Sequence, residues 1–157
     1  MATQHFNVYI RGTGGGLPED WKRAMHAPEE ELPKLSKEQS EIAKRMEIAE
    51  KDYARGVLAG TYAEQRNKIR GELLGERVDQ ILSGLGPGYV LSAVIREATE
   101  LRWIARIATP KGIRDVVIPL ELAEDVIDSP ALEVLERLRR LILPAVGREE
   151  LVVGDAR

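Results

Sequence analysis

The sequence contains no cysteine, which excludes disulfides, cysteine nucleophiles and thiolate metal sites. Only two histidines are present, His5 and His26, and no cluster of histidine and carboxylate residues has the spacing of metal ligands. No apolar run approaches the roughly 20 residues that span a bilayer, and the first residues lack the basic and apolar regions of a secretory signal. We therefore predict a soluble, cytoplasmic protein with no membrane contact, no metal and no cofactor.

Aromatic residues are also scarce, at 4 % of the 157 residues, whereas 43 % are hydrophobic and 31 % are charged. This length and composition predict a single domain over residues 1–157. The formal net charge is −3, and only residues 87–119 carry a surplus of basic side chains. Because phosphate contacts supply most of the affinity for nucleic acids, general nucleic-acid binding is possible but disfavoured. Among the few aromatics, Trp103 is the best candidate for a core anchor.

Hydrophobic periodicity predicts an α+β fold. Phe6, Val8 and Ile10 recur at every second position, which is typical of a half-buried strand. Ser129 followed by Pro130 predicts the start of the last helix. The expected order is a strand in 1–12, a loop with a short helix in 13–35, a helical arm in 36–85, a three-stranded β-meander in 89–119, helices in 120–147 and a tail in 148–157. We expect a small, mainly antiparallel four-stranded sheet with the helices on one face.

The helical arm, residues 36–85, begins with the spacing of a capping box at Ser36 and Gln39. It also contains four glycines, each of which costs about 1 kcal/mol relative to alanine inside a helix. One unbroken helix is therefore disfavoured, and we expect breaks near 47–50 and 65–68.

A stripe of small residues in this arm allows two helices to approach closely. Gly56, Gly60 and Ala63 recur at helical spacing, and Tyr53 precedes them on the same stripe. The stripe predicts packing within the chain or self-association into a homo-oligomer.

Residues 40–55 resemble the core of a helix-turn-helix motif. An alanine early in the first helix, Ala43, is followed by the apolar Met46, a position for a tight turn, and Tyr53 as an apolar anchor of the second helix. The resemblance implies nucleic-acid binding by the second helix, with Lys51 and Arg55 as its basic residues. Glu47 replaces the usual turn glycine, and two amphipathic helices packing on a core would give the same apolar spacing.

The middle strand of the meander has one apolar face and one face that carries arginines. Arg102 and Arg106 flank Ile104, and we expect Arg96 and Arg114 nearby. Since arginine pairs well with carboxylates, these five residues predict a surface for a protein partner and allow that partner to be acidic. A solvated strand face carrying arginines is an equally good interpretation.

The sequence predicts no catalytic residues. Carboxylates stand beside basic residues at helical surface spacing, as Glu47 and Lys51 do, which indicates a solvated face. The glycine run at 12–16 lacks the lysine and the spacing of a phosphate-binding loop. We therefore predict a non-catalytic protein-interaction module, an adaptor or a small subunit of a larger assembly. The alternative is a helix-turn-helix nucleic-acid binder, and the third hypothesis is a hydrolase that uses carboxylates.

Overall fold

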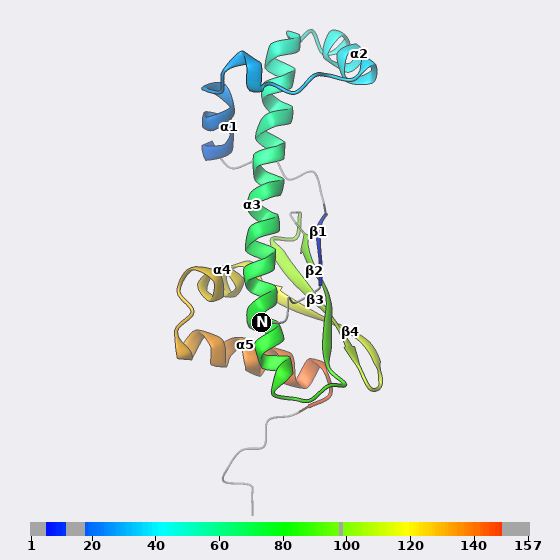
Figure 1. Ribbon diagram of the computed structural model, residues 1–157, viewed down its shortest axis with the longest axis vertical. Coiled ribbons are helices and arrows are strands. Elements are labelled where there is room, and N and C mark those ends of the chain that lie inside the picture. Colours follow the sequence, from blue (N-terminus) through cyan, green and yellow to red (C-terminus); the bar gives the residue numbers. More distant parts are fainter. Residues whose placement is uncertain (1–5, 12–17, 98, 149–157) are drawn as a thin grey trace, which may run out of the picture. The chain divides into compact units, whose positions relative to one another are not determined.

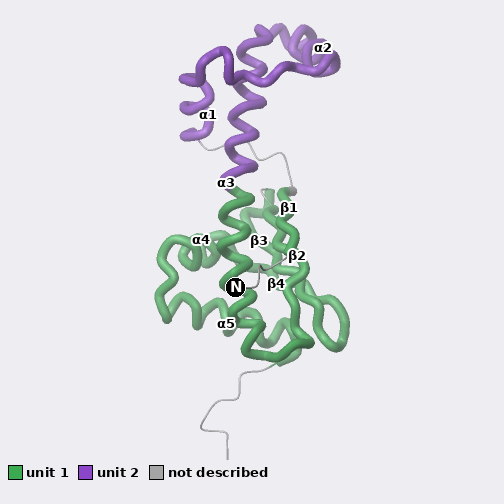
Figure 2. Tube along the Cα trace, in the orientation of Figure 1, with its two compact units in different colours: residues 1–12, 67–157 green, residues 13–66 purple. Residues whose placement is uncertain are grey.

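The computed structural model describes residues 6–11, 18–97 and 99–148. The chain forms two compact units (Figure 2). We call residues 1–12 together with 67–157 the sheet unit, and residues 13–66 the helical unit. The glycine run at 12–16 and most of the tail lie outside the described residues. None of the helices in the described part of the chain is long and apolar enough to cross a membrane.

The sheet unit contains one four-stranded mixed sheet, which confirms the predicted α+β class. Its strands are β1 (Asn7–Arg11), β2 (Val90–Glu97), β3 (Arg102–Thr109) and β4 (Gly112–Pro119), in the order β1-β2-β3-β4. The meander strands β2, β3 and β4 pair antiparallel, whereas β1 pairs parallel with β2. A parallel pair needs a crossover of a dozen or more residues, and the long chain between β1 and β2 supplies it.

One face of this sheet is covered by helices (Figure 1). They are the C-terminal half of α3 (Glu50–Ser83), α4 (Leu120–Asp128) and α5 (Leu132–Ala145). Their buried side chains form one core with Trp103 of β3, which is only 1 % exposed, so the predicted anchor is confirmed. The main helical contributors are Leu74, Val78 and Leu82 of α3, Leu122 and Val126 of α4, and Leu138 and Ile142 of α5.

Helix α3 approaches the sheet closely at two glycines. A Cβ atom built at Gly71 would lie 2.6 Å from Cγ1 of Val8 and 3.0 Å from Cζ3 of Trp103. A Cβ atom at Gly75 would collide with the ring of Phe6. These contacts explain why glycine is present inside the helix despite its low helix propensity.

The helical unit contains α1 (Pro18–Met25), a short 3-10 helix (Glu29–Glu31), α2 (Lys37–Arg45) and the N-terminal part of α3. Ala24, Ala27, Leu58 and Ala59 form its small core. Arg55 fastens α1 to α3, because its Nη1 donates to the carbonyls of Ala24, Met25 and Ala27 at 2.8–3.1 Å. The last turn of a helix has unpaired carbonyls, so a guanidinium there satisfies them.

Two local predictions for the helical arm are confirmed and one is wrong. Ser36 and Gln39 form the capping box. The expected break near 47–50 is also present, since α2 ends before Glu47 and α3 begins at Glu50. The break at 65–68 is absent, because α3 continues through these residues. Most of them favour helix, and no proline interrupts them.

The last helix also differs from its prediction at its start. Its N-cap is Ala131, without a side-chain cap hydrogen bond, instead of Ser129. Leu132 is 78 % exposed, whereas Leu138 and Ile142 of the same helix are fully buried. Leu132 is the first residue of the helix and lies beyond the part that packs on the sheet.

The two environments of glycine in α3 predict opposite effects of alanine. Gly71→Ala should lower the free energy of unfolding by about 1–2 kcal/mol, because overpacking exceeds the gain in helix propensity. Gly60→Ala should raise it by up to about 1 kcal/mol, since nothing lies within 4 Å of its Cβ position. Urea denaturation followed by circular dichroism measures both. Equal effects of the two substitutions would contradict the close approach at Gly71.

The ion pair between α3 and α4 predicts a dependence of stability on pH. Both nitrogens of the Arg70 fork lie 3.1 Å from the carboxylate oxygens of Asp128. Their hydrogen bonds hold the pKa of Asp128 below its usual value of 3.8. A carboxylate whose pKa is lower in the folded chain than in the unfolded chain stabilises the fold at pH values above its unfolded pKa. This stabilisation is lost as the pH falls through the folded pKa. Asp128→Asn should therefore be slightly less stable than wild type at pH 7, and the difference in thermal midpoint should vanish near pH 2. A difference that persists at pH 2 would contradict this account.

Candidate interaction surface

The second face of the sheet carries a continuous apolar row. Cross-strand pairing places Tyr9, Ile95, Ile104 and Val117 side by side, one from each strand. Ile95 and Ile104 do not belong to the core beneath the helices. We call the face that carries this row the open face, because the described helices of the sheet unit lie on the other side (Figure 1).

The ends of this row are accessible and its centre is shielded. Tyr9 on β1 is 50 % exposed and Val117 on β4 is 43 % exposed. Ile95 and Ile104 are buried although no helix of the core packs on them. Their neighbours on this face include Arg102 and Arg106, and arginine side chains commonly cover apolar surface with their alkyl stems.

Two ion pairs flank the row, one on each side. Arg102 Nε donates to Glu97 Oε2 at 2.8 Å. Arg106 donates from Nε and Nη2 to the two carboxylate oxygens of Asp115, at 2.9 and 3.0 Å. The hydrogen bonds with Asp115 raise the pKa of Arg106 above its usual value. The open face thus presents apolar contact area between charges that are already neutralised.

The structure brings together three of the five predicted partner residues. Arg102, Ile104 and Arg106 share the open face, as alternation along β3 requires. Arg96 pairs across strands with Trp103, and Arg114 pairs with Ile107, so both lie on the opposite face. Arg96 is engaged there, since it donates to the carbonyls of Glu97 and Arg102 and lies 5.7 Å from the Trp103 ring.

Sequence reasoning missed most of the apolar part of this face. A second row, formed by Val90, Ala108 and Ile113, lies beyond the Arg106 pair. Val90 is 51 % exposed and Ile113 is 63 % exposed. Each strand shows period-2 alternation of apolar residues. Only the register between strands reveals that the apolar residues of adjacent strands lie side by side and form rows across the sheet.

The residues of the helix-turn-helix resemblance do form two helices joined by a tight turn. Glu47 adopts a left-handed conformation, with φ of 57°. The amide of Ile48 donates to the carbonyl of Ala43 at 2.9 Å, which is the wider hydrogen bond of a Schellman motif. The proposed basic residues have other partners, however. Lys51 Nζ lies 2.6 Å from Glu29 Oε1, and Arg55 binds carbonyls at the end of α1.

The predicted self-association stripe is partly occupied within the chain. A Cβ atom at Gly56 would lie 3.2 Å from the Trp21 ring of α1. Ala63 is buried, whereas Gly60 has nothing within 4 Å of its Cβ position. Self-association through Tyr53, Gly56, Gly60 and Ala63 stays a prediction. Gly60 is the member of this set with space beside it for a second helix.

The acidic side chains do not gather into a metal-binding group in the described part of the chain. Its residues include no group of three or more acidic or histidine side chains that could hold a metal ion. Glu29 and Asp128 have lowered pKa values because Lys51 and Arg70 donate to them. A general acid at neutral pH needs a raised pKa, so these two carboxylates have a structural role.

Comparison with protein families, curated proteins and solved structures finds no significant match to this chain.

Proposed function

We propose that the chain is a non-catalytic protein-interaction module, an adaptor or a small subunit of an assembly, and that its open face binds a protein partner. The observation that carries this proposal is the apolar row of Tyr9, Ile95, Ile104 and Val117 on the face opposite the helices. A sheet with one packed face and one apolar, accessible face has the surface pattern of an interaction site.

The ion pairs refine the chemistry of the expected partner. Arg102 and Arg106 already hold Glu97 and Asp115 at hydrogen-bond distance. An acidic partner would have to displace these carboxylates, which cancels most of its electrostatic gain. A partner that lays an apolar strip along the row, with polar groups of both signs beside it, fits the face better. Such a partner gains affinity by burying apolar area between the two ion pairs.

A helix-turn-helix function is the second candidate, and the turn at Glu47 favours it. The N-terminus of α3, however, presents Glu50 and Asp52 as well as Lys51. Carboxylates at that position repel phosphates unless they accept hydrogen bonds from cytosine amino groups. The pairing of Lys51 with Glu29 further lowers the positive charge available to DNA.

The interaction proposal predicts the effect of one charge placed on the apolar row. The full-length chain, immobilised and exposed to native lysate, should enrich at least one protein measured by quantitative mass spectrometry. Val117→Glu should reduce that enrichment about tenfold or more, because a carboxylate would be buried without a partner. Leu132→Glu makes the same chemical change at a residue on α5 that is 78 % exposed. It should retain the enrichment.

Two outcomes would contradict the proposal. One is that no protein is enriched above a blank support. The other is that Val117→Glu and Leu132→Glu retain the same proteins in the same amounts, which would exclude the open face. Circular dichroism of both variants confirms that they fold.

The nucleic-acid alternative has its own test. Fluorescence anisotropy of labelled duplex DNA should show no binding by the full chain, even at low salt. Steeply salt-dependent binding that weakens in Lys51→Gln would instead support the helix-turn-helix function, because each phosphate contact releases counterions. Lys34→Gln, an exposed lysine in the same unit, is the matched control.

A further inference from the structure

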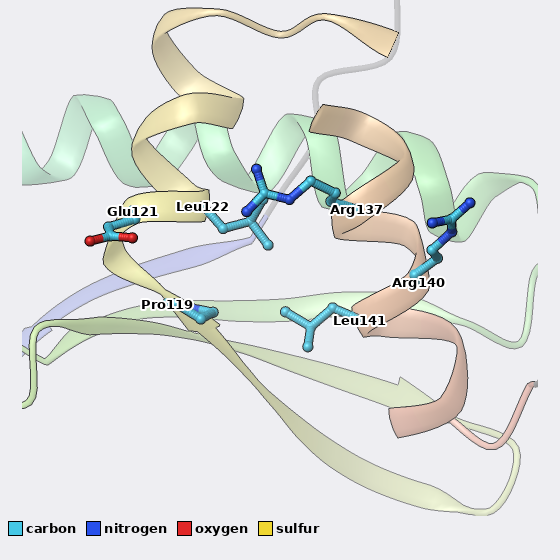
Figure 3. Close-up of a pocket in the computed structure, with 6 residues that line it drawn as sticks. All are labelled: Pro119, Glu121, Leu122, Arg137, Arg140 and Leu141. Carbon is cyan, nitrogen blue, oxygen red and sulfur yellow. The ribbon is translucent and has the colours of Figure 1, made fainter. Parts of the chain in front are cut away.

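A cavity of about 480 Å³ opens to solvent between the end of β4 and helices α4 and α5 (Figure 3). Six residues line it: Pro119, Glu121, Leu122, Arg137, Arg140 and Leu141. Leu122 is buried beneath it, and Leu141 points toward Pro119, so its floor is apolar. The side chain of Glu121 points away from α5. The cavity therefore combines an apolar floor with two cationic side chains.

Among the described residues, neither guanidinium has a carboxylate within hydrogen-bond distance, unlike other arginines of this unit. Arg70, Arg102 and Arg106 each hold a carboxylate within 3.1 Å. Arg137 extends from α5 toward α4 (Figure 3), and its Nη1 lies 3.7 Å from Oδ2 of Asp125. That separation is too long for a hydrogen bond. Arg137 is thus available to an anion that approaches more closely.

Arg140 is one helical turn further along α5, on the same side as Arg137. Within the described residues it forms no ion pair or hydrogen bond. Its guanidinium lies at the outer edge of the cavity and points away from α4 (Figure 3). Since no partner restrains it, rotation of the side chain can bring it to the opening without breaking a contact.

We infer that this cavity binds a small amphipathic carboxylate, a short aliphatic chain that ends in a carboxyl group. The aliphatic chain lies on Pro119, Leu122 and Leu141, and the carboxylate accepts hydrogen bonds from Arg137 and Arg140. Guanidinium forks match the geometry of a carboxylate, and the apolar floor favours a ligand with an apolar body. This site lies apart from the open face and does not depend on the proposed function.

Titration of the full, 15N-labelled chain with sodium octanoate tests the inference by NMR. The amide shifts of Glu121, Leu122 and residues 137–141 should change and saturate. Acetate supplies the carboxylate without the aliphatic chain, and 1-octanol supplies the chain without the charge. Each should bind at least about tenfold more weakly, because each lacks one of the two contacts.

Three substitutions test the roles of the charges. Arg140→Gln should weaken octanoate binding about three- to tenfold, as expected for a solvent-accessible charged contact. Arg139→Gln makes the same change on the same helix, but Arg139 does not line the cavity. The affinity of this variant for octanoate should therefore equal that of wild type. Asp125→Asn removes the competitor of Arg137 and should strengthen binding about twofold.

The inference is overturned if octanoate shifts do not saturate or lie outside α4 and α5. It is also overturned if Arg140→Gln and Arg139→Gln bind alike. Inorganic phosphate is a further probe. If phosphate binds as tightly as octanoate, the apolar floor has no role in binding and the inference of an amphipathic ligand is overturned. Because Arg140 and Arg139 are exposed, both variants should fold, and circular dichroism verifies this.

Discussion

The close approach of α3 to the sheet is the contact on which the sheet unit depends. At Gly71 the helix lies so near that Val8 and Trp103 occupy the space that a side chain would need. Trp103 then joins side chains of α3, α4 and α5 in one core. Packing of this density tolerates little change in volume. Because α3, α4 and α5 use the same side of the sheet, none of these three helices covers the apolar row on the other side.

The open face carries charged side chains beside its apolar residues. Ile95 and Ile104 are buried although they do not belong to the core beneath α3, α4 and α5, and Arg102 and Arg106 lie beside them on the same face. Each arginine is held by a carboxylate of an adjacent strand, Glu97 or Asp115. Cross-strand pairs of opposite charge stabilise a sheet modestly. Here they also flank the apolar row, one on each side.

Local patterns predicted much of the fold, because capping, alternation and turns depend on neighbours in the sequence. The capping box at Ser36 and Gln39 and the core position of Trp103 are examples. Features set by distant contacts were not predicted. The glycines inside α3 are an example, because their packing partners, such as Val8, are remote in sequence. The faces of Arg96 and Arg114 follow from strand register, which no single strand encodes. For this reason, only Arg102, Ile104 and Arg106 of the five predicted partner residues lie on the open face.

The central claim is that the open face contacts another protein in the cell. Site-specific photo-crosslinking tests it directly, with a photoreactive amino acid placed at position 117 on the open face or at position 132 on α5. The account predicts that illumination of native cells yields a discrete covalent protein adduct from position 117 and none from position 132. Adducts from position 132 alone, or none from position 117, would contradict it.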